Sequence, residues 1–234
     1  MIGQKRAKRI SKLALKSGAN IILVAPSGHG KSMLAREVAS VEYFDLESPY
    51  PPEQLLGLFD WDIPGKRIVC DEIHNCNKQD DWALFLDRFN GEVIFTTTDP
   101  NKLIEAIKTR SFILELDSYS LKDLAKISDV RGRNGKVIAI LSRGIPRRAK
   151  NLGALFEEFG GSVTEFLSMM GVKREGRILL FPEEKAYLNC LENGAMGKVN
   201  LQRVLNLANF QEVELSLLRL GLIKVSHAGR EKVY

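Results

Sequence analysis

The strongest constraint on this chain is a short stretch near its N-terminus, Ala25-Pro26-Ser27-Gly28-His29-Gly30-Lys31-Ser32. An apolar run over residues 21–24 precedes it, and a helical pattern follows it. Strand, glycine-rich loop and helix in this order form the phosphate-binding P-loop. Gly28 and Gly30 let the backbone turn its N–H groups inward, and the helix N-terminus favours an anion. The stretch therefore predicts a nucleotide-binding α/β domain.

The residues of this loop have separate predicted roles. Lys31 can reach the β- and γ-phosphates, and the Ser32 hydroxyl can bind Mg²⁺. Ala25 occupies a position where glycine is usual, and alanine can close the turn if its φ is negative. The alternative is a glycine turn with an accidental lysine. We expect the nucleotide to contact the loop and the start of its helix, namely Pro26, Ser27, Gly28, His29, Gly30, Lys31, Ser32 and Met33.

A second motif follows the P-loop along the chain. Residues 67–70 form an apolar strand pattern that ends in two adjacent carboxylates, Asp71 and Glu72. We expect Asp71 to hold Mg²⁺, directly or through water, and Glu72 to polarise the attacking water. The alternative is an exposed strand end without function. Phosphoryl transfer depends on positioning and charge stabilisation, which these groups can supply to ATP with Mg²⁺.

Composition favours a cytoplasmic enzyme. The chain has 234 residues, 44% of them hydrophobic, which suffices for a substantial core. No apolar run approaches the length of a membrane span and no signal peptide is visible, so we expect no membrane contact. The three cysteines show no metal-binding spacing, and a reducing compartment is expected.

Positive charge is concentrated between residues 121 and 150, whereas the net charge of the whole chain is only +5. The only acidic residues in this stretch are Asp123 and Asp129. The basic ones are Lys122, Lys126, Arg131, Arg133, Lys136, Arg143, Arg147, Arg148 and Lys150. Such a local excess predicts an anionic neighbour, which could be a nucleotide, a nucleic acid or an acidic partner subunit. The alternative is a solvated helical face.

The periodicity divides the chain into three parts. Residues 1–117 alternate between strand and helix patterns, which predicts a parallel sheet with helices on both faces. The expected strands are 21–24, 42–46, 67–70, 93–97 and 111–116, and the expected helices are 4–17, 31–39, 52–59, 80–90 and 101–107. Ligands bind at the carboxyl ends of such strands, where both motifs fall.

The other two parts are smaller. Residues 118–180 form a small domain that is predicted to be helical as far as residue 176, with a helix start and capping box at Ser120. Residues 181–234 show three helix patterns. The first begins after Pro182 and is followed by a glycine turn at Gly194–Gly197, and the other two lie near 200–207 and 210–220. A predicted hairpin follows, with strands at 222–225 and 231–234. Three helices and a terminal hairpin are typical of a winged helix.

Two specific strings, Asp71-Glu72-Ile73-His74 and Ser142-Arg143-Gly144-Ile145-Pro146-Arg147, resemble the RuvB family of AAA+ ATPases. This family drives branch migration of Holliday junctions. The resemblance follows the family's order through almost the whole chain. It implies an AAA+ domain, a helical lid and a C-terminal winged helix.

The resemblance also implies roles for further residues. Ile2-Gly3-Gln4 matches the string that borders the adenine pocket, and Arg147 matches the sensor 2 arginine that reaches the γ-phosphate from the lid. Thr97-Thr98 matches the sensor 1 strand. Thr98 would form a hydrogen bond with the attacking water or the γ-phosphate, and Thr97 is the alternative residue for this role. The other alternative is a strand-end hydroxyl without function.

Arg110 matches the position of the arginine finger, which would act in trans on the ATP of a neighbouring subunit. Lys108 and a merely solvated arginine are the alternatives. The family further implies a homo-oligomer, most simply a hexameric ring or spiral.

The chain also departs from the family pattern. RuvB proteins carry a long β-hairpin that docks on RuvA, between the helix after the Asp-Glu-Ile-His string and the sensor 1 strand. Here residues 82–89 pass to Val93 through Asn90-Gly91-Glu92, so the hairpin is absent and docking on RuvA is not expected. Ala228 replaces the first arginine of the wing.

Three functions remain in view. The first is an oligomeric, Mg²⁺-dependent ATPase that moves along duplex or branched DNA in recombination or replication. The second is an ATP-switched loader or adaptor that grips DNA or a partner protein without translocating. The third, a winged-helix regulator, leaves the arginine finger without a purpose. DNA contact would be mostly sequence-independent and made to phosphates, with Lys224, His227, Arg230 and Lys232 as candidates in the winged helix.

Overall fold

The structure is a computed structural model that describes residues 1–39, 43–46, 67–176, 178–192, 194–226 and 229–233. Contacts divide the chain into two compact units, Met1–Ile127 with Gly144–Arg148, and Ser128–Arg143 with Ala149–Tyr234. Among the described residues, no helix has the length and apolar character that a membrane span requires.

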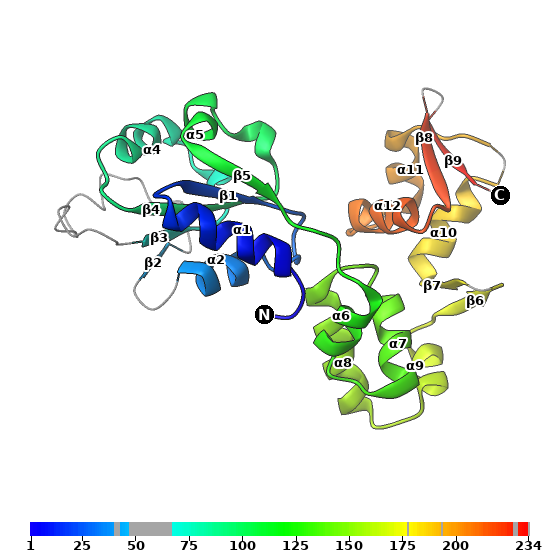
Figure 1. Cartoon of the computed structure of the whole chain (residues 1–234). Helices are drawn as coiled ribbons and strands as arrows, with labels where there is room; N and C mark the ends of the chain where they lie inside the picture. Colours follow the sequence, from blue (N-terminus) through cyan, green and yellow to red (C-terminus); the bar gives the residue numbers. More distant parts are fainter. Residues whose placement is uncertain (40–42, 47–66, 177, 193, 227–228, 234) are drawn as a thin grey trace. The chain divides into compact units, whose positions relative to one another are not determined.

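The first unit is built on a parallel sheet (Figure 1). The described strands are β1 (Asn20–Val24), β2 (Tyr43–Leu46), β3 (Arg67–Cys70), β4 (Glu92–Thr97) and β5 (Ser111–Glu115). Their order across the sheet is β2-β3-β4-β1-β5, with β1 between β4 and β5. All four neighbouring pairs are parallel, so the carboxyl ends of β1, β3 and β4 meet at one edge.

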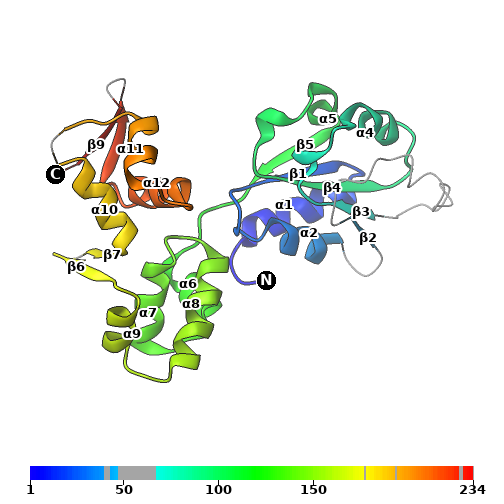
Figure 2. The same cartoon turned by 180° about the vertical axis from the view of Figure 1, so that it is seen from behind.

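Helices cover both faces of this sheet because successive strand residues point to opposite sides. Ile22 and Phe95 face a core that includes α4 (Gln79–Leu86) and α5 (Glu105–Thr109). Ile21, Leu23 and Ile94 face a second core with α1 (Lys5–Lys16) and α2 (Lys31–Ala39). Figures 1 and 2 show the two helix layers on either side of the sheet. The predicted α/β architecture is confirmed.

The predicted strands agree with the observed ones to within one residue at either end. The helix predicted at 101–107 is wrong in detail. The Asp99 side chain accepts a hydrogen bond from the Asn101 backbone N–H and starts a short 3₁₀ helix, η2 (Pro100–Lys102). Another 3₁₀ turn, η1 (Ile73–Asn75), follows β3. The backbone then extends at Leu103, whose side chain is buried, before α5 begins. The helix predicted at 52–59 lies outside the described residues.

The second unit contains two cores. One lies among α7 (Gly132–Leu141), α8 (Pro146–Phe159) and α9 (Val163–Met169), while α6 (Leu121–Ile127) falls in the first unit. Residues 173–175, predicted as the end of a helical stretch, instead form β6 (Lys173–Glu175), antiparallel to β7 (Ile178–Leu180). Gly171 has a φ of 64°, a left-handed conformation that glycine adopts easily and that ends the helix.

The other core of this unit lies among α10 (Pro182–Cys190), α11 (Lys198–Leu205) and α12 (Phe210–Arg219). They lead into an antiparallel hairpin of β8 (Ile223–Ser226) and β9 (Gly229–Lys232). The predicted order of three helices and a hairpin is observed, with β9 beginning two residues before the predicted strand. His227 and Ala228 lie outside the described residues.

A buried ion pair links the two cores of the second unit. Arg143, which follows α7, pairs with Glu184 of α10 at 2.7 Å between Nη2 and Oε2, and 1% and 2% of the two side chains are exposed. The Glu184 carboxylate also accepts from the Phe181 backbone N–H at 2.9 Å and from the Ser216 hydroxyl. Arg143 also donates a hydrogen bond to the Leu179 carbonyl. These bonds tie the α7 end to the C-terminal helices.

Candidate nucleotide-binding site

The loop between β1 and α2 has the backbone shape of a phosphate cradle. Gly28 and Gly30 have φ values of 76° and 82°, in the left-handed region that other residues adopt at a cost. A Cβ at Gly28 would lie 3.0 Å from Cγ2 of Ile145, so the loop is also closely packed there. The two glycines therefore allow the tight turn that the sequence analysis expects of a phosphate-binding loop.

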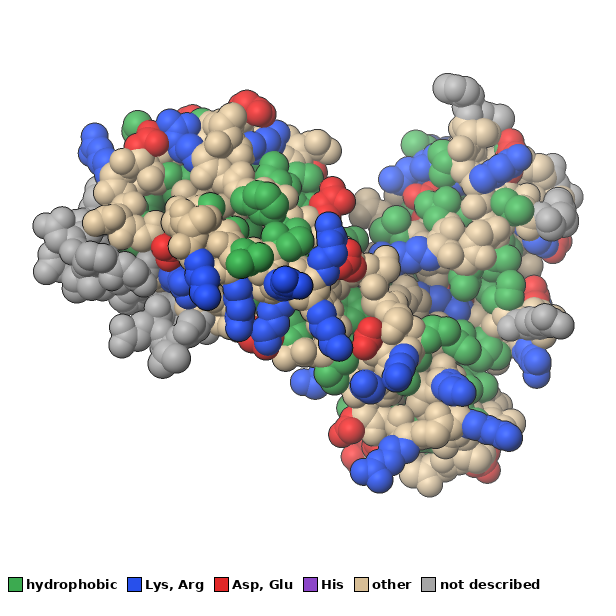
Figure 3. Space-filling view, viewed as in Figure 1, with side chains coloured by type: hydrophobic (Ala, Val, Ile, Leu, Met, Phe, Trp, Pro, Cys, Tyr) green, Lys and Arg blue, Asp and Glu red, His purple; other side chains and the backbone are tan. Residues whose placement is uncertain are grey.

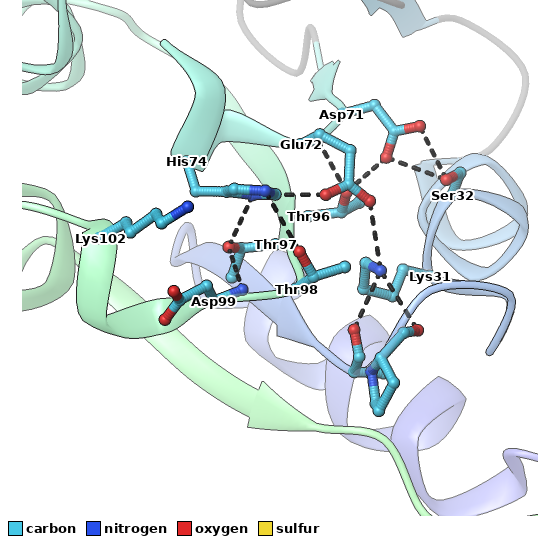
Figure 4. Close-up of polar contacts among 12 residues, drawn as sticks. Lys31, Ser32, Asp71, Glu72, His74, Thr96, Thr97, Thr98, Asp99 and Lys102 are labelled. Atoms are coloured by element: carbon cyan, nitrogen blue, oxygen red, sulfur yellow. Dashed lines mark hydrogen bonds and ion pairs between the residues drawn. The ribbon is translucent and has the colours of Figure 1, made fainter. Parts of the chain in front are cut away.

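Lys31 brings its ammonium group to the centre of this loop. Its Nζ donates to the Ala25 carbonyl at 3.0 Å and lies 3.2 Å from Oε1 of Glu72 (Figure 4). The lysine side chain is only 4% exposed. The cation of the P-loop and the second carboxylate of the acidic motif, predicted separately, therefore share one location.

Ser32 and Asp71 form a pair of hard oxygen donors beside it. The Ser32 hydroxyl lies 2.9 Å and 2.8 Å from the two carboxylate oxygens of Asp71. Among the described residues, no group of three or more His, Cys, Asp and Glu side chains could hold a metal. A hydroxyl and one carboxylate suit Mg²⁺, which keeps several waters and uses substrate phosphates as ligands. The donor set therefore fits a magnesium-nucleotide.

Thr96 is a site residue that the sequence analysis missed. Its side chain is fully buried at the end of β4 and donates to Oδ1 of Asp71. The same hydroxyl oxygen accepts from the Glu72 backbone N–H at 3.0 Å. Because Cys70 pairs with Phe95 in the sheet, Thr96 lies beside the acidic motif. A hydroxyl at the end of an apolar strand was the available signal.

We expect Thr96→Val, which keeps the shape of the side chain, to destabilise the protein by about 1–3 kcal/mol, because the Glu72 N–H loses its acceptor. Asp71 also loses a donor that orients it, so ATP hydrolysis should require more Mg²⁺. Urea unfolding and a magnesium titration of ATPase activity measure the two effects. Thr98→Val is the matched control and should leave stability close to that of the parent. Parental stability and magnesium requirement in Thr96→Val would contradict this role.

His74 joins Thr97 and Thr98 to the acidic motif. Its Nδ1 lies 3.1 Å from the Thr97 hydroxyl and 3.3 Å from Oε2 of Glu72. Its Nε2 lies 3.2 Å from the Thr98 hydroxyl. Figure 4 shows the imidazole between these groups. Thr98 therefore reaches Glu72 through the histidine ring.

The segment around Arg147 lies against the P-loop within the same unit. The Arg147 backbone N–H donates to the Gly28 carbonyl at 3.2 Å. Its side chain is exposed, and no ion pair involves it among the described residues. The arginine is therefore anchored beside the loop by its backbone, with its guanidinium group free to meet a ligand.

The N-terminal segment also approaches the loop. A Cβ at Gly3 would lie 2.8 Å from the Tyr119 ring, and the Tyr119 hydroxyl donates to the His29 carbonyl at 3.2 Å. Tyr119 is thus a second contact of the loop that the sequence analysis missed. Ile2 and Met33, both predicted to contact nucleotide, are 39% and 58% exposed.

Arg110 is not brought together with these residues. It precedes Ser111, which pairs with Asn20 at the start of β1, whereas the P-loop follows the other end of that strand. Five residues of strand, at about 3.3 Å each, separate the two positions. The Arg110 guanidinium group binds both carboxylate oxygens of Asp87, at 2.7 Å and 2.8 Å. It cannot serve the P-loop of its own chain.

Three candidate DNA-binding cations of the C-terminal hairpin have acidic partners within their own unit. Lys224 lies 3.0 Å from Glu231. Arg230 lies 2.7 Å from Glu214, which also accepts from the Tyr187 hydroxyl, and Lys232 lies 3.9 Å from Glu192. The positive charge of this hairpin is therefore largely compensated.

Solved structures of RuvB match the chain along its length. The Holliday junction branch migration motor RuvB of Thermotoga maritima aligns with a TM-score of 0.77 and 24% identity, over 99% of this chain and 92% of that one. A point mutant of the same RuvB gives 0.78 and 23%, over 100% and 93%. The chain therefore has the RuvB-like AAA+ ATPase fold.

Two further comparisons cover parts of the chain. The family model of magnesium chelatase, subunit ChlI, matches residues 1–43. A lon protease homolog of Methanothermobacter thermautotrophicus is 30% identical over 107 residues, which are 46% of this chain. The match spans only 20% of that protein. The first of these matches includes the P-loop and agrees with the fold assignment.

Proposed function

We propose that this RuvB-like chain is an oligomeric, Mg²⁺-dependent ATPase that works as a motor on duplex or branched DNA, in recombination or replication. The observation that carries the ATPase proposal is the convergence of Lys31, Ser32, Asp71 and Glu72 at one edge of the sheet. A cation, a pair of oxygen donors for the metal and a second carboxylate that can accept a proton from water are the groups that phosphoryl transfer to water requires.

The chain's own residues have distinct tasks in this mechanism. Lys31 would exchange its contact with the Ala25 carbonyl for the β- and γ-phosphates, while Gly28 and Gly30 allow the loop to wrap around them. Ser32 and Asp71 would hold Mg²⁺, which neutralises charge on the phosphates when it is bound. Gly3 and Ile2 would border the adenine, and Arg147 would meet the γ-phosphate.

Water activation falls to the acidic motif and the groups around it. Glu72 would accept a proton from the attacking water, and Thr98 would orient that water or the γ-phosphate. His74 contacts both side chains and can keep Glu72 turned toward the loop. Thr96 holds the Glu72 backbone, whose φ of 51° lies in the left-handed region. The carboxylate is thus positioned from two sides.

Arg110 supplies the argument for an oligomer. It lies a strand's length from its own P-loop, so an arginine finger at this position would act on the ATP of a neighbouring subunit. A heterologous contact of this kind closes into a ring or continues as a spiral. We propose six subunits on the strength of the RuvB-like fold.

We further propose three functional domains: residues 1–117 bind the nucleotide, residues 118–180 form the lid, and residues 181–234 form a winged helix. The buried Arg143–Glu184 pair would make lid and winged helix move together. A loader or adaptor that grips without translocating is the second candidate. One observation favours it: the five residues 87–91 join α4 directly to β4, which leaves no hairpin for docking on RuvA.

DNA-stimulated ATP turnover coupled to strand displacement on a branched substrate tests the motor directly. Turnover and DNA binding without strand displacement would support the loader instead. An absence of DNA binding at low salt with ATP present would remove both DNA roles and leave a protein adaptor.

The oligomer has its own test. We expect Arg110→Ala subunits and Glu72→Gln subunits, each inactive alone, to regain part of the activity when they are mixed. Mixed rings contain interfaces that pair an intact Glu72 with an intact Arg110, so only action in trans gives rescue. ATP hydrolysis by mixtures of known ratio measures it. No rescue in rings shown to be mixed would contradict the proposed role of Arg110.

A further inference from the structure

The N-terminal helix α1 carries an unusual charge for its size. It holds six basic residues among its 12, namely Lys5, Arg6, Lys8, Arg9, Lys12 and Lys16, and no acidic residue. The whole chain has 34 basic and 29 acidic residues. Helix α1 therefore accounts for the entire net positive charge of +5, and the rest of the chain is close to neutral.

Four of these cations form a single stripe. Lys5, Arg9, Lys12 and Lys16 are spaced by four, three and four residues, which places them on one face of an α-helix. All four are exposed, and together with Lys8 and Leu13 they line a shallow hollow. Figure 3 shows a row of Lys and Arg side chains where α1 lies in Figure 1. At about 1.5 Å per residue, the stripe is roughly 16 Å long.

The stripe lacks acidic partners within the described chain. Lys8 pairs with Glu37, and Arg6 pairs with Asp117 at 3.0 Å, but both lie off the stripe. No ion pair among the described residues involves any of the four stripe cations. The cations of the C-terminal hairpin are compensated by Glu214, Glu231 and Glu192, so the stripe carries more unpaired positive charge than that hairpin.

The chemistry of the helix favours a nucleic-acid backbone over a membrane. A helix that lies in a membrane surface inserts a wide apolar face. The apolar side of α1 is already used, because Ala7 and Leu15 are buried against the sheet and Ile10 packs beside them. Leu13, 58% exposed, is the one large apolar side chain of α1 left facing outward. Regularly spaced cations without an apolar face suit a line of phosphates.

We propose that the stripe of Lys5, Arg9, Lys12 and Lys16 is a binding site for the phosphate backbone of nucleic acid, separate from the lid and the winged helix. The site would read no sequence, since it offers only charge to phosphates. Its position on the nucleotide-binding unit would let DNA contact the ATPase domain itself. Binding of nucleic acid at this stripe would not depend on ATP turnover.

The triple variant Arg9→Gln, Lys12→Gln and Lys16→Gln tests the site in the full-length chain. We expect its affinity for a short fluorescent duplex of mixed sequence to fall. The slope of log affinity against log salt should become shallower by up to about 2.7, since each phosphate contact adds about 0.9. ATP hydrolysis without DNA should stay at the parental rate, because α1 lies outside the catalytic cluster.

The matched control is Lys78→Gln, Arg88→Gln and Lys108→Gln, which removes the same charge from the α4–α5 side of the unit. It should leave the salt slope almost unchanged. Equal effects of the two triple variants on the salt slope would overturn the proposal. So would an α1 variant that no longer binds anionic phospholipid vesicles but still binds DNA with the parental affinity. If the parent protein itself fails to bind DNA, the DNA motor fails with it. If the parent protein binds DNA and the α1 triple variant binds it equally well, only this inference fails and the proposed DNA motor stands.

Discussion

Glu72→Gln should lower the rate of ATP hydrolysis by about 10²–10⁴-fold, the range that a positioned general base contributes. The substitution keeps the size of the side chain that lies 3.2 Å from Lys31 but removes its negative charge. ATP binding should persist, because Lys31 and the loop glycines are untouched and a charge that repels phosphate is gone. Single-turnover hydrolysis and equilibrium binding of a fluorescent ATP analogue separate the two effects.

Two comparison variants make this result specific. Asp71→Asn removes the negative charge of the proposed Mg²⁺ ligand and should therefore raise the Mg²⁺ concentration needed for activity. Glu72→Gln is not expected to change that concentration. Glu105→Gln removes an exposed carboxylate on α5 and should hydrolyse ATP at the parental rate. Parental turnover in Glu72→Gln would show that another group activates the water.

Arg143→Ala should destabilise the second unit by about 3–5 kcal/mol, since it leaves the Glu184 carboxylate buried without its cation. The pair is almost fully buried and links the core of α7–α9 to that of α10–α12. Urea unfolding followed by Tyr fluorescence or circular dichroism would measure the loss. Lys224→Ala breaks the exposed Lys224–Glu231 pair and should cost no more than about 1 kcal/mol.

The double variant Arg143→Met with Glu184→Leu distinguishes lost charge pairing from lost packing. It leaves no unpaired charge, so it should recover part of the stability that Arg143→Ala loses. Full recovery is not expected, because the Ser216 hydroxyl and the Phe181 N–H lose their acceptor. If Arg143→Ala is as stable as the parent, the pair does not hold the two cores together.

The same pair predicts a loss of stability in acid. Burial raises the pKa of Glu184, but hydrogen bonds from Arg143, Ser216 and the Phe181 N–H outweigh burial and hold that pKa below its usual value. A depressed pKa in the folded state contributes stability above the unfolded value of about 4.3. This contribution is lost as the pH falls from there through the folded pKa. Arg143→Ala should flatten this part of the stability profile.

Much of the fold and part of the site could be predicted because the signals are local. The glycines of the P-loop impose a backbone shape within a few residues, and apolar periodicity distinguishes strand from helix over a similar length. Strands alternating with helices then predict a parallel sheet, whose carboxyl edge must hold both motifs. Lys31, Ser32, Asp71 and Glu72 needed no more than this. The helix predicted over 173–175 failed because Gly171 ends the helix and residues 173–175 pair with β7, the strand that follows them in the sequence.

The amino-acid sequence was enough to predict the P-loop, the acidic motif and most of the order of helices and strands. Tertiary structure decided which distant residues meet. The register of β3 against β4 brings Thr96 to Asp71, and the length of β1 keeps Arg110 from its own P-loop. Packing pairs Arg230 with Glu214, whereas the four cations of the α1 stripe have no acidic partner among the described residues. Patterns among neighbouring residues determine the propensity for helix or strand. Whether a charged side chain finds an opposite charge depends on residues far apart in the sequence, which only the folded chain brings together.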